Sequence, residues 1–452
     1  MRIHFIAIGG AAMHNLAIAL KNKNYIVSGS DDIINDPSKS RLMKHGLLPA
    51  KYGWNAENIS KELDAVILGM HAKTDNPELL RARELEIKIF SYPEFIFNQS
   101  KNKFRVVIGG SHGKTTIASM ILHVMNFNNI DVDYMVGAQL KGFDVMVKIT
   151  EENKFIILEG DEYLTSPIDL RPKFHLYKPD LALISGIAWD HINVFPTYDI
   201  YLEQFKIFID SIQEKGTLIY NSDDIDLNKI VNKSINRINK IPYNTPAYSV
   251  NNNVTYLKAN NREIPLMIFG EHNLNNLMGA KSVCQQMGID EDSFFRAITS
   301  FEGASNRLEL ICKNLDSIAY KDFAHSPSKV MATTSAVRSQ NPNKKIVACL
   351  ELHTYSSLNI DFITAYHNAL SSVDQAIIFY SQKALKLKEM KDLEESDIKK
   401  AFNHNNLIVI NNVNDLINYL SSLEYSNLAL LMMSSGKFEG MDLGLISDLM
   451  NK

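Results

Sequence analysis

Short apolar segments alternate with stretches of helical periodicity along most of the chain. Segments 3–8, 65–68, 181–184 and 429–433 are runs of mainly aliphatic residues. Runs of this kind are typical of parallel strands that are buried on both faces of a sheet. Because helical stretches separate them, the pattern predicts doubly wound α/β units.

Two polar segments interrupt this pattern and are candidate domain boundaries. The first, residues 98–103, has the sequence NQSKNK, and the second lies near residues 301–306, after a helix-like stretch. A chain of 452 residues is too long for one hydrophobic core. The two polar segments therefore predict three domains of ordinary size, spanning residues 1–99, 100–301 and 302–452.

The composition of the chain argues against several functional classes. The net charge of -4 gives no electrostatic reason to bind nucleic acid or an anionic membrane. No apolar run approaches the roughly 20 residues of a membrane-spanning helix, and segment 3–8 runs straight into a glycine turn, as a first strand would. The three cysteines form no CxxC pair and predict neither a disulfide nor a zinc site. The expected compartment is the cytoplasm.

Residues 104–125, FRVVIGGSHGKTTIASMILHVM, combine a strand, a glycine-rich turn and a helix. Glycines let backbone N–H groups surround a phosphate at a helix N-terminus. Lys114 can reach the β- and γ-phosphates of ATP, and a Thr hydroxyl can hold Mg²⁺. The usual spacing of this motif needs a glycine where Ile108 stands, so the predicted ATP loop is one residue short.

The N-terminal turn is a weaker nucleotide signal. Gly9 and Gly10 follow the first predicted strand without completing G-x-G-x-x-G. Ser30 and Asp31 follow the second strand about twenty residues later, where an acid often meets a ribose hydroxyl. Taken alone, this turn is compatible with NAD(P), with another nucleotide or with a purely structural role.

Acidic residues and a histidine follow two later strands. Glu159 ends one apolar run, and Asp190 and His191 follow another. Ligands of open α/β sheets bind at the carboxyl ends of strands. A single acid there is more often a helix cap, but Glu159 and His191 beside an ATP loop are predicted Mg²⁺ ligands.

Together, these stretches resemble the Mur ligase family, the ATP-dependent amide ligases of peptidoglycan synthesis. The motifs occur in the family's order along essentially the whole chain. They are the compact loop 110–116, E-x-D-E at 159–162, Asp190-His191, G-x-H-N-x-x-N at 270–276, Arg307 and D-F-A-H-S-P at 322–327. The resemblance implies a Rossmann-like N-terminal domain, a central P-loop ATPase domain and a Rossmann-like C-terminal domain.

The resemblance also implies roles for individual residues. The implied ATP site comprises Gly110, His112, Gly113, Lys114, Thr115, Thr116, His272, Asn273, Asn276, Arg307 and Asp322. The implied Mg²⁺ ligands are Thr115, Glu159 and His191. The implied catalytic residues are Lys114, His191, Arg307 and His325. The residues implied for a UDP-sugar in the first domain are Gly9, Gly10, Ser30 and Asp31.

The implied reaction uses ATP to convert a carboxylate into an acyl phosphate, from which an amine then displaces phosphate. The N-terminal turn resembles the branch whose acid substrate is UDP-N-acetylmuramate. Within that branch, segments 161–180 and 433–441 are similar to members that add L-Ala-γ-D-Glu-meso-diaminopimelate, and the alternative amine is L-alanine. The implied specificity loops are 351–357 and 434–437. Departures from the family pattern are Ala7, Ser185-Gly186 and Ser326.

Two other classes compete with this interpretation. A non-catalytic nucleotide-binding regulator would not need the full set of Lys114, Glu159, His191 and Arg307. An NAD-dependent dehydrogenase would need a more complete N-terminal glycine motif and no separate ATP domain. The sequence does not specify an oligomeric state.

Overall fold

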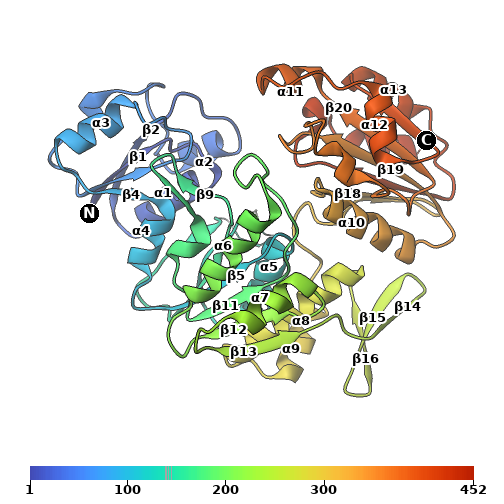
Figure 1. The fold of residues 1–452 in the computed structure, drawn as a ribbon, viewed down its shortest axis with the longest axis horizontal. Coiled ribbons are helices and arrows are strands. Elements are labelled where there is room, and N and C mark those ends of the chain that lie inside the picture. The colour runs from blue at the N-terminus through green and yellow to red at the C-terminus, as the bar shows by residue number, and fades with distance from the viewer. Residues whose placement is uncertain (138–139, 141, 144, 452) are drawn as a thin grey trace. The chain divides into compact units, whose positions relative to one another are not determined.

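The computed structural model describes residues 1–137, 140, 142–143 and 145–451. The chain forms two compact units. The first comprises residues 1–187, 198–244 and 279–291, and the second comprises residues 188–197, 245–278 and 292–452. Parallel sheets flanked by helices occur in both, which confirms the predicted α/β class (Figure 1). The three domain ranges stay a prediction.

The first unit contains two sheets. The N-terminal sheet is entirely parallel, in the order β2 (Ile26–Ser30), β1 (Arg2–Ile6), β3 (Ala65–Leu68) and β4 (Ile89–Ser91). Its helices are α1 (Ala11–Asn22), α2 (Ser38–Lys44), η1 (Ala56–Asn58), α3 (Pro77–Glu84) and α4 (Tyr92–Gln99). Helix α3 begins where the Asn76 side chain caps two backbone N–H groups and Pro77 presets the first turn. The short stretch of β3 is buried throughout, as its AVIL sequence predicts.

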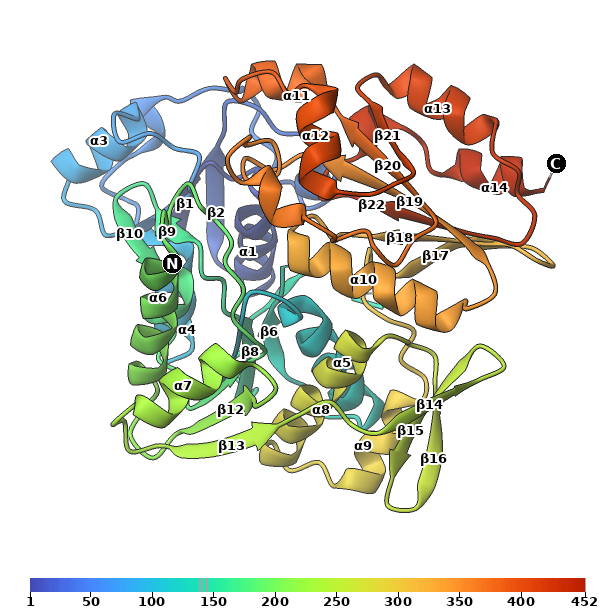
Figure 2. The same cartoon turned by 45° about the vertical axis from the view of Figure 1, so that its right-hand side comes forward.

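The second sheet of this unit has seven strands and carries the ATP loop. Its order is β13 (Asn239–Tyr243), β12 (Thr217–Asn221), β11 (Leu181–Ile184), β5 (Phe104–Gly109), β8 (Phe155–Glu159), β6 (Asp133–Met135) and β7 (Val147–Lys148). Only the pairing of β7 with β6 is antiparallel among these described strands. Helices α5 (Lys114–Phe127), α6 (Tyr198–Asp210) and α7 (Ile225–Lys233) flank it (Figure 2).

A short hairpin leaves this sheet after β8. It consists of β9 (Leu164–Ser166) and β10 (Asp169–Pro172), which pair antiparallel, and the 3-10 turn η2 (Lys173–Leu176) follows. Helix α4 of the N-terminal region contacts η2. Segment 161–180, which resembles family members that add the tripeptide, therefore forms these elements of the first unit.

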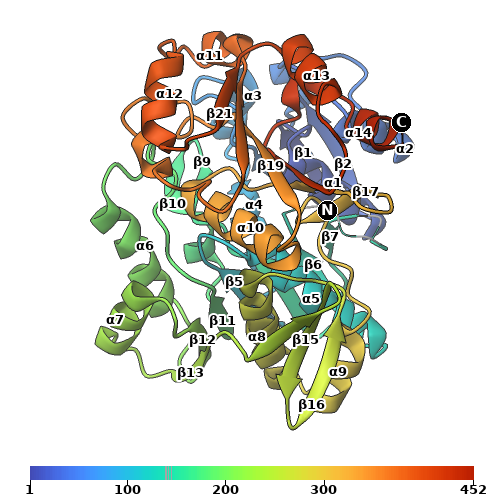
Figure 3. The same ribbon diagram turned by 90° about the vertical axis from the view of Figure 1, so that its right-hand side faces the viewer.

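The second unit is built on a six-stranded sheet. Its order is β17 (Glu309–Lys313), β18 (Ile318–Asp322), β22 (Leu428–Met433), β19 (Lys345–Leu352), β20 (Gln375–Tyr380) and β21 (Leu407–Ile410), with β17 antiparallel to β18. Its helical segments are α10 (Pro327–Gln340), η3 (Ile363–Tyr366), α11 (Gln382–Leu387), α12 (Glu395–Phe402), α13 (Val413–Ser421), η4 (Phe438–Gly440) and α14 (Gly444–Met450). Helix α10 contacts β19 and β22 (Figure 3).

The remaining elements lie around these sheets. A separate antiparallel sheet comprises β14 (Tyr248–Asn251), β15 (Val254–Ala259) and β16 (Arg262–Leu266). Helices α8 (Glu271–Gln286) and α9 (Glu291–Ile298) each have residues in both units. Among the described residues, every helix is too short or too polar to cross a bilayer.

Candidate active site

The predicted ATP loop connects the central strand β5 to helix α5. Gly110 and Gly113 have φ values of +124° and +77°, a region that favours glycine. A Cβ atom on Gly110 would lie 2.1 Å from the Ser185 hydroxyl oxygen. The loop is also fastened to the neighbouring strand end, because Ser111 N donates to the carbonyl of Gly186. Conformation and close packing therefore both favour glycine at position 110, and conformation favours it at position 113, before any ligand is considered.

Lys114 opens α5 and is held by two acceptors. Its Nζ donates to the Gly110 carbonyl over 2.7 Å and to Glu162 Oε2 over 2.5 Å. Glu162 is 1% exposed and also receives a hydrogen bond from the Tyr201 hydroxyl. Burial alone would lower the pKa of Lys114, but the carboxylates of Glu162, Asp161 and Glu159 outweigh it and raise that pKa. The ammonium is thus charged and already positioned at the loop.

Thr115 and Glu159 form the second contact at this edge of the sheet. The Thr115 hydroxyl donates to Glu159 Oε1 over 2.7 Å, and Gly137 N donates to Glu159 Oε2 over 2.6 Å. Thr116, the next residue of α5, is buried, and His112 in the loop is half-buried. The predicted pair of Mg²⁺ ligands from β8 and α5 is therefore side by side in the structure.

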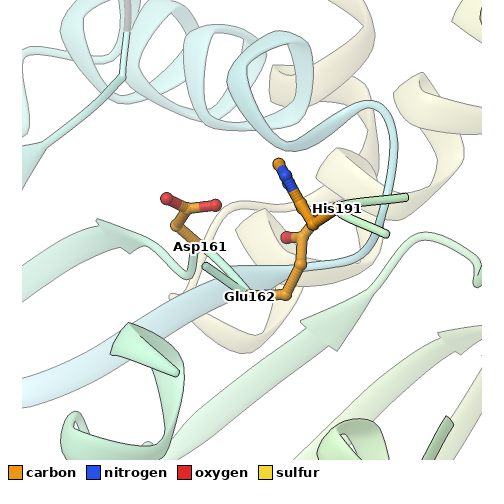
Figure 4. A group of neighbouring side chains, drawn as sticks. All are labelled: Asp161, Glu162 and His191. Carbon is orange, nitrogen blue, oxygen red and sulfur yellow. The ribbon is translucent and has the colours of Figure 1, made fainter. Parts of the chain in front are cut away.

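His191 lies with a different pair of carboxylates. Ligand atoms of Asp161, Glu162 and His191 all lie within 4.8 Å of one another (Figure 4). Carboxylate oxygens are the ligands that Mg²⁺ prefers. Asp161 and Glu162 are not among the predicted ligands. Their position two and three residues after Glu159, in E-x-D-E, is the signal in the sequence that could have identified them.

The N-terminal turn is organised around Ser30 and Asp31. Backbone N–H groups of Ala7 and Ile8 donate to the Ser30 carbonyl, each over 3.0 Å, and Gly9 N donates to Asp31 Oδ2 over 2.6 Å. Burial is the main reason that the pKa of Asp31 is raised. Ala7, where the family usually has glycine, has a φ of +67° and so keeps the backbone conformation that glycine favours. Gly10 directly precedes α1.

The second unit carries the residues of the implied ATP site that lie in the G-x-H-N-x-x-N motif. His272, Asn273 and Asn276 all lie in the first two turns of α8. Asn273 donates to the Phe269 carbonyl over 2.9 Å, which fixes the helix start. His272 Nδ1 is buried and has no hydrogen-bond partner among the described residues, and burial lowers the pKa of this imidazole. A neutral ring nitrogen without a partner is consistent with a polar ligand group at this position.

Asp322 and Arg307 are linked through one turn. Backbone N–H groups of Leu308 and Ala324 each donate to Asp322 over 2.7 Å, one to each carboxylate oxygen. The Arg307 guanidinium lies over the Phe323 ring, 4.5 Å from its centroid. Asp322 thus fixes the turn that carries Arg307, and its contact with the ATP ribose stays a prediction.

His325 is half-buried beside a charged pair of the second unit. Its Nδ1 donates to the Phe323 carbonyl over 2.7 Å, which leaves Nε2 as the acceptor. Burial, assisted by the positive charge of Lys329, lowers the pKa of His325 to about 3. Lys329 lies 3.6 Å from Asp190, and despite burial the lysine and neighbouring histidines hold the pKa of Asp190 well below its usual value. His325 is therefore neutral at physiological pH.

The two predicted specificity loops meet at the carboxyl ends of β19 and β22. Glu351, which is buried, accepts hydrogen bonds from the Ser434 hydroxyl and from Phe438 N, the latter over 2.9 Å. His353 Nδ1 lies 3.8 Å from Glu351. The Ser435 hydroxyl oxygen is buried without a hydrogen-bond partner among the described residues. This arrangement places a carboxylate and a hydroxyl where an ammonium group of a substrate could be held.

Comparison with known proteins decides the family. The Mur ligase middle domain matches residues 108–284, and the domain described as Mur ligase family, catalytic domain matches residues 2–103. The UDP-N-acetylmuramate–L-alanine ligase of Clostridium novyi is 30% identical over 81% of this chain and 81% of its own. The chain belongs to the Mur ligase family. A second such ligase, from Ruthia magnifica, is 28% identical over 99% of this chain and 96% of its own.

Solved structures support the fold of this Mur ligase. A UDP-N-acetylmuramate–alanine ligase from Thermotoga maritima superimposes with a TM-score of 0.72 at 17% identity, covering 100% of this chain and 98% of that chain. A murein peptide ligase from Psychrobacter arcticus gives a TM-score of 0.69 at 21% identity, covering 100% and 99%. The predicted three-domain α/β fold is confirmed by these likenesses.

The family assignment fixes the coarse activity. This Mur ligase is an ATP-dependent acid–amino-acid ligase that forms ADP and phosphate, and it belongs to peptidoglycan biosynthesis. The regulator and dehydrogenase alternatives gain no support from these comparisons. The roles of the individual site residues stay predictions, and the structure brings together Lys114 with Glu162, Thr115 with Glu159, and His191 with Asp161.

Proposed function

We propose that this Mur ligase joins UDP-N-acetylmuramate to the tripeptide L-Ala-γ-D-Glu-meso-diaminopimelate. The observation that supports the tripeptide is segment 161–180. It resembles family members that add this peptide through Asp161-Glu162-Tyr163 and through R-x-K-F-x-x-Y-x-P, which runs from Arg171 to Pro179. The reaction takes place in the cytoplasm in this proposal, because both ATP and the UDP-sugar are found there.

The same segment is ordered close to the strand end that bears the carboxylates. Lys173 donates to Asp161 over 2.5 Å, and its ammonium lies 5.6 Å from the centroid of the Tyr163 ring. Arg171 pairs with Asp169 over 2.6 Å within β10. The segment is therefore held by charge pairs beside Asp161, a position from which it can influence which substrates reach the site.

The first step activates the acid. In this proposal Gly9, Gly10 and Asp31 bind the UDP-sugar, and a carboxylate oxygen of the muramyl group attacks the γ-phosphorus of ATP. The bond to the β-phosphate oxygen breaks, which gives the acyl phosphate and ADP. Lys114 and the loop N–H groups orient the phosphates. Bound Mg²⁺ neutralises the phosphate charge, and the residues that would hold it are Thr115, Glu159, Asp161, Glu162 and His191.

The second step forms the amide. The neutral amine of the tripeptide attacks the acyl carbon, phosphate leaves with its oxygen, and the amine proton is released. Arg307 and Asp322 act in the first step, in which Arg307 stabilises the charge of the transferring phosphoryl group and Asp322 orients the ATP ribose. His325, which its low pKa keeps neutral, offers Nε2 as a hydrogen-bond acceptor for the amine. Glu351 and Ser435 provide further polar groups for the amine substrate.

L-alanine is the second candidate amine. The curated relatives that match the chain at 26% to 30% identity are named UDP-N-acetylmuramate–L-alanine ligases. Both candidates share every ATP residue, so they differ only in the amine pocket. The tripeptide remains our proposal because segments 161–180 and 433–441 resemble family members that add it.

ADP release with UDP-N-acetylmuramate and Mg-ATP tests the proposal, with L-alanine and the tripeptide compared as amine donors. The Lys114→Met variant serves as the control for contaminating ATPases. We expect turnover with the tripeptide and at most a small rate with L-alanine. Turnover with L-alanine alone would overturn the tripeptide assignment, and turnover with neither would overturn the proposed acid and amine together.

A further inference from the structure

A buried polar network lies beneath the N-terminal turn of the first unit. Its members are His4 on β1, Ser28 and Ser30 on β2, and Glu78 in the first turn of α3. His4 and Ser30 are each 2% exposed, and Glu78 is completely buried. Polar groups of this kind occur in a protein interior only where partners compensate their lost hydration.

Glu78 is the centre of this network. Its Oε1 accepts hydrogen bonds from Asn55 N over 3.0 Å and from Asn58 Nδ2 over 2.8 Å. Its Oε2 accepts from the Ser30 hydroxyl and from His4 Nε2, the latter over 3.4 Å. Burial opposes ionisation, but these hydrogen bonds outweigh it and lower the pKa of Glu78. The carboxylate is thus charged and joins β1, β2 and the segment around η1.

The N-terminal turn is hydrogen-bonded to Ser30 and to its neighbour Asp31. The Ser30 carbonyl accepts hydrogen bonds from Ala7 N and Ile8 N, and Asp31 accepts from Gly9 N. The Asp31 carbonyl also accepts from Gly53 N over 2.8 Å. The backbone of Ala7, Ile8 and Gly9 is therefore fixed by Ser30 and Asp31, and the Ser30 side chain is fixed by Glu78.

Stability of the core does not in general require a charged residue at a buried position such as that of Glu78. A buried ionised carboxylate costs desolvation free energy, and replacing such groups by well-packed apolar residues is often neutral or stabilising. The network also reaches the ligand-binding edge of the sheet, because Ser30 is the last residue of β2. Ligands of parallel sheets bind at the carboxyl ends of the strands. A role in geometry explains the placement better than a role in stability.

We infer that Glu78 is a positioning residue for the acid substrate: through Ser30, it fixes the turn of Gly9, Gly10 and Asp31 that receives a nucleoside-diphosphate sugar. This inference rests on the proposed function, which assigns the UDP-sugar to this turn. Glu78 itself does not touch substrate, because it is completely buried. Its loss should weaken sugar-nucleotide binding and leave the ATP site unchanged.

The test measures two dissociation constants by calorimetry on the full chain, one for UDP-N-acetylmuramate and one for ATP. For Glu78→Ala we expect a UDP-N-acetylmuramate Kd raised about tenfold, as for loss of one well-placed polar contact, with the ATP Kd within about twofold of wild type. In steady state, the KM for the sugar nucleotide should rise while kcat stays within about twofold. The matched control is Glu84→Ala, an exposed glutamate at the other end of α3.

A second variant tests the inference if Glu78→Ala does not fold. Asn58 is exposed and donates to Glu78, so Asn58→Ala should fold normally and raise the UDP-N-acetylmuramate Kd about twofold to threefold. A folded Glu78→Ala protein with wild-type affinity, or equal losses of sugar-nucleotide and ATP affinity, would overturn the inference. Wild-type protein that fails to bind UDP-N-acetylmuramate would overturn the proposed function, and the inference with it.

Discussion

The ammonium of Lys114 lies 2.5 Å from Glu162 Oε2, and the carboxylate is nearly inaccessible to solvent. In the proposed function this lysine meets the phosphates of ATP, which would then compete with the Glu162 carboxylate for its ammonium. This pairing keeps Lys114 charged and extended along the loop without ligand, so little ordering remains to be done when ATP binds.

Replacement of Lys114 should separate activity from stability. Lys114→Met is expected to lower the rate of ADP formation at least about 100-fold, because a donor to the transferring phosphate is lost. It also leaves the buried Glu162 carboxylate without its ammonium partner, which should lower the unfolding free energy by about 3 kcal/mol. ADP release and urea unfolding measure the two effects.

A double variant distinguishes the two contributions of Lys114. Adding Glu162→Gln to Lys114→Met removes the buried charge, so most of the lost stability should return while activity stays low. Lys206→Met, at an exposed position of α6, is the control. ADP formation at the wild-type rate in Lys114→Met would contradict the assignment of this loop.

The contact between Thr115 and Glu159 should set the requirement for Mg²⁺. Thr115→Val keeps the shape of the side chain and removes the hydroxyl, and Glu159→Gln removes the charge. Either change is expected to raise the Mg²⁺ concentration for half-maximal activity about tenfold or more, since a ligand or its orienting partner is lost. Titration of Mg²⁺ at saturating ATP checks this, with the exposed Glu203→Gln as control. Unchanged Mg²⁺ dependence in both variants would exclude this pair from the metal site.

Local sequence pattern was sufficient for the strands and the ATP loop, but not for the side-chain partners. The β5 strand and the turn before α5 are encoded by contiguous residues, so periodicity and glycine spacing predict them. Lys114 and Glu162 are 48 positions apart, as are Ser30 and Glu78. Such pairs depend on which strand ends become neighbours and on which rotamers fit there. For Asp161 the E-x-D-E motif offers a signal in the sequence, but its distance from His191 is set only in the folded chain.

Gly110 should tolerate no side chain. In Gly110→Ala the new Cβ would lie 2.1 Å from Ser185 Oγ and 2.9 Å from Ser185 N, and the backbone has a φ of +124°. We expect the loop to shift, ATP affinity to fall at least about tenfold, and stability to fall by roughly 2 kcal/mol or more. Gly288→Ala is the matched control, because Gly288 has a φ of +94° but no atom within 4 Å of the added Cβ. It should share the backbone strain and bind ATP normally, and equal ATP affinities in the two variants would contradict the packing argument.

The neutral state of His325 should be visible in the pH dependence of stability. Its pKa is about 3 in the folded chain, against 6.5 for an ordinary histidine, because burial and Lys329 disfavour the charged ring. Between these values the unfolded chain binds a proton that the folded chain does not, so the unfolding free energy falls as the pH drops below 6.5. Above pH 6.5 this contribution is complete and constant. His325→Gln should therefore reduce the slope between pH 6.5 and 4.5 by up to about 1.4 kcal/mol per pH unit.

Between pH 6.5 and 4.5 the pH dependence of the unfolding free energy reports on His325 and not on its acidic neighbour Asp190. Since the pKa of Asp190 is held below its usual 3.8, the stability that this carboxylate contributes is lost only at lower pH. The chain has two tryptophans, so urea unfolding of a Trp54→Phe background can be followed through Trp189, which lies in the second unit beside Phe362. His367→Gln, at an exposed position of the same unit, should leave the slope unchanged. Parallel curves for wild type and His325→Gln across this window would mean that His325 titrates normally, and its proposed role as a neutral acceptor for the amine would then be lost.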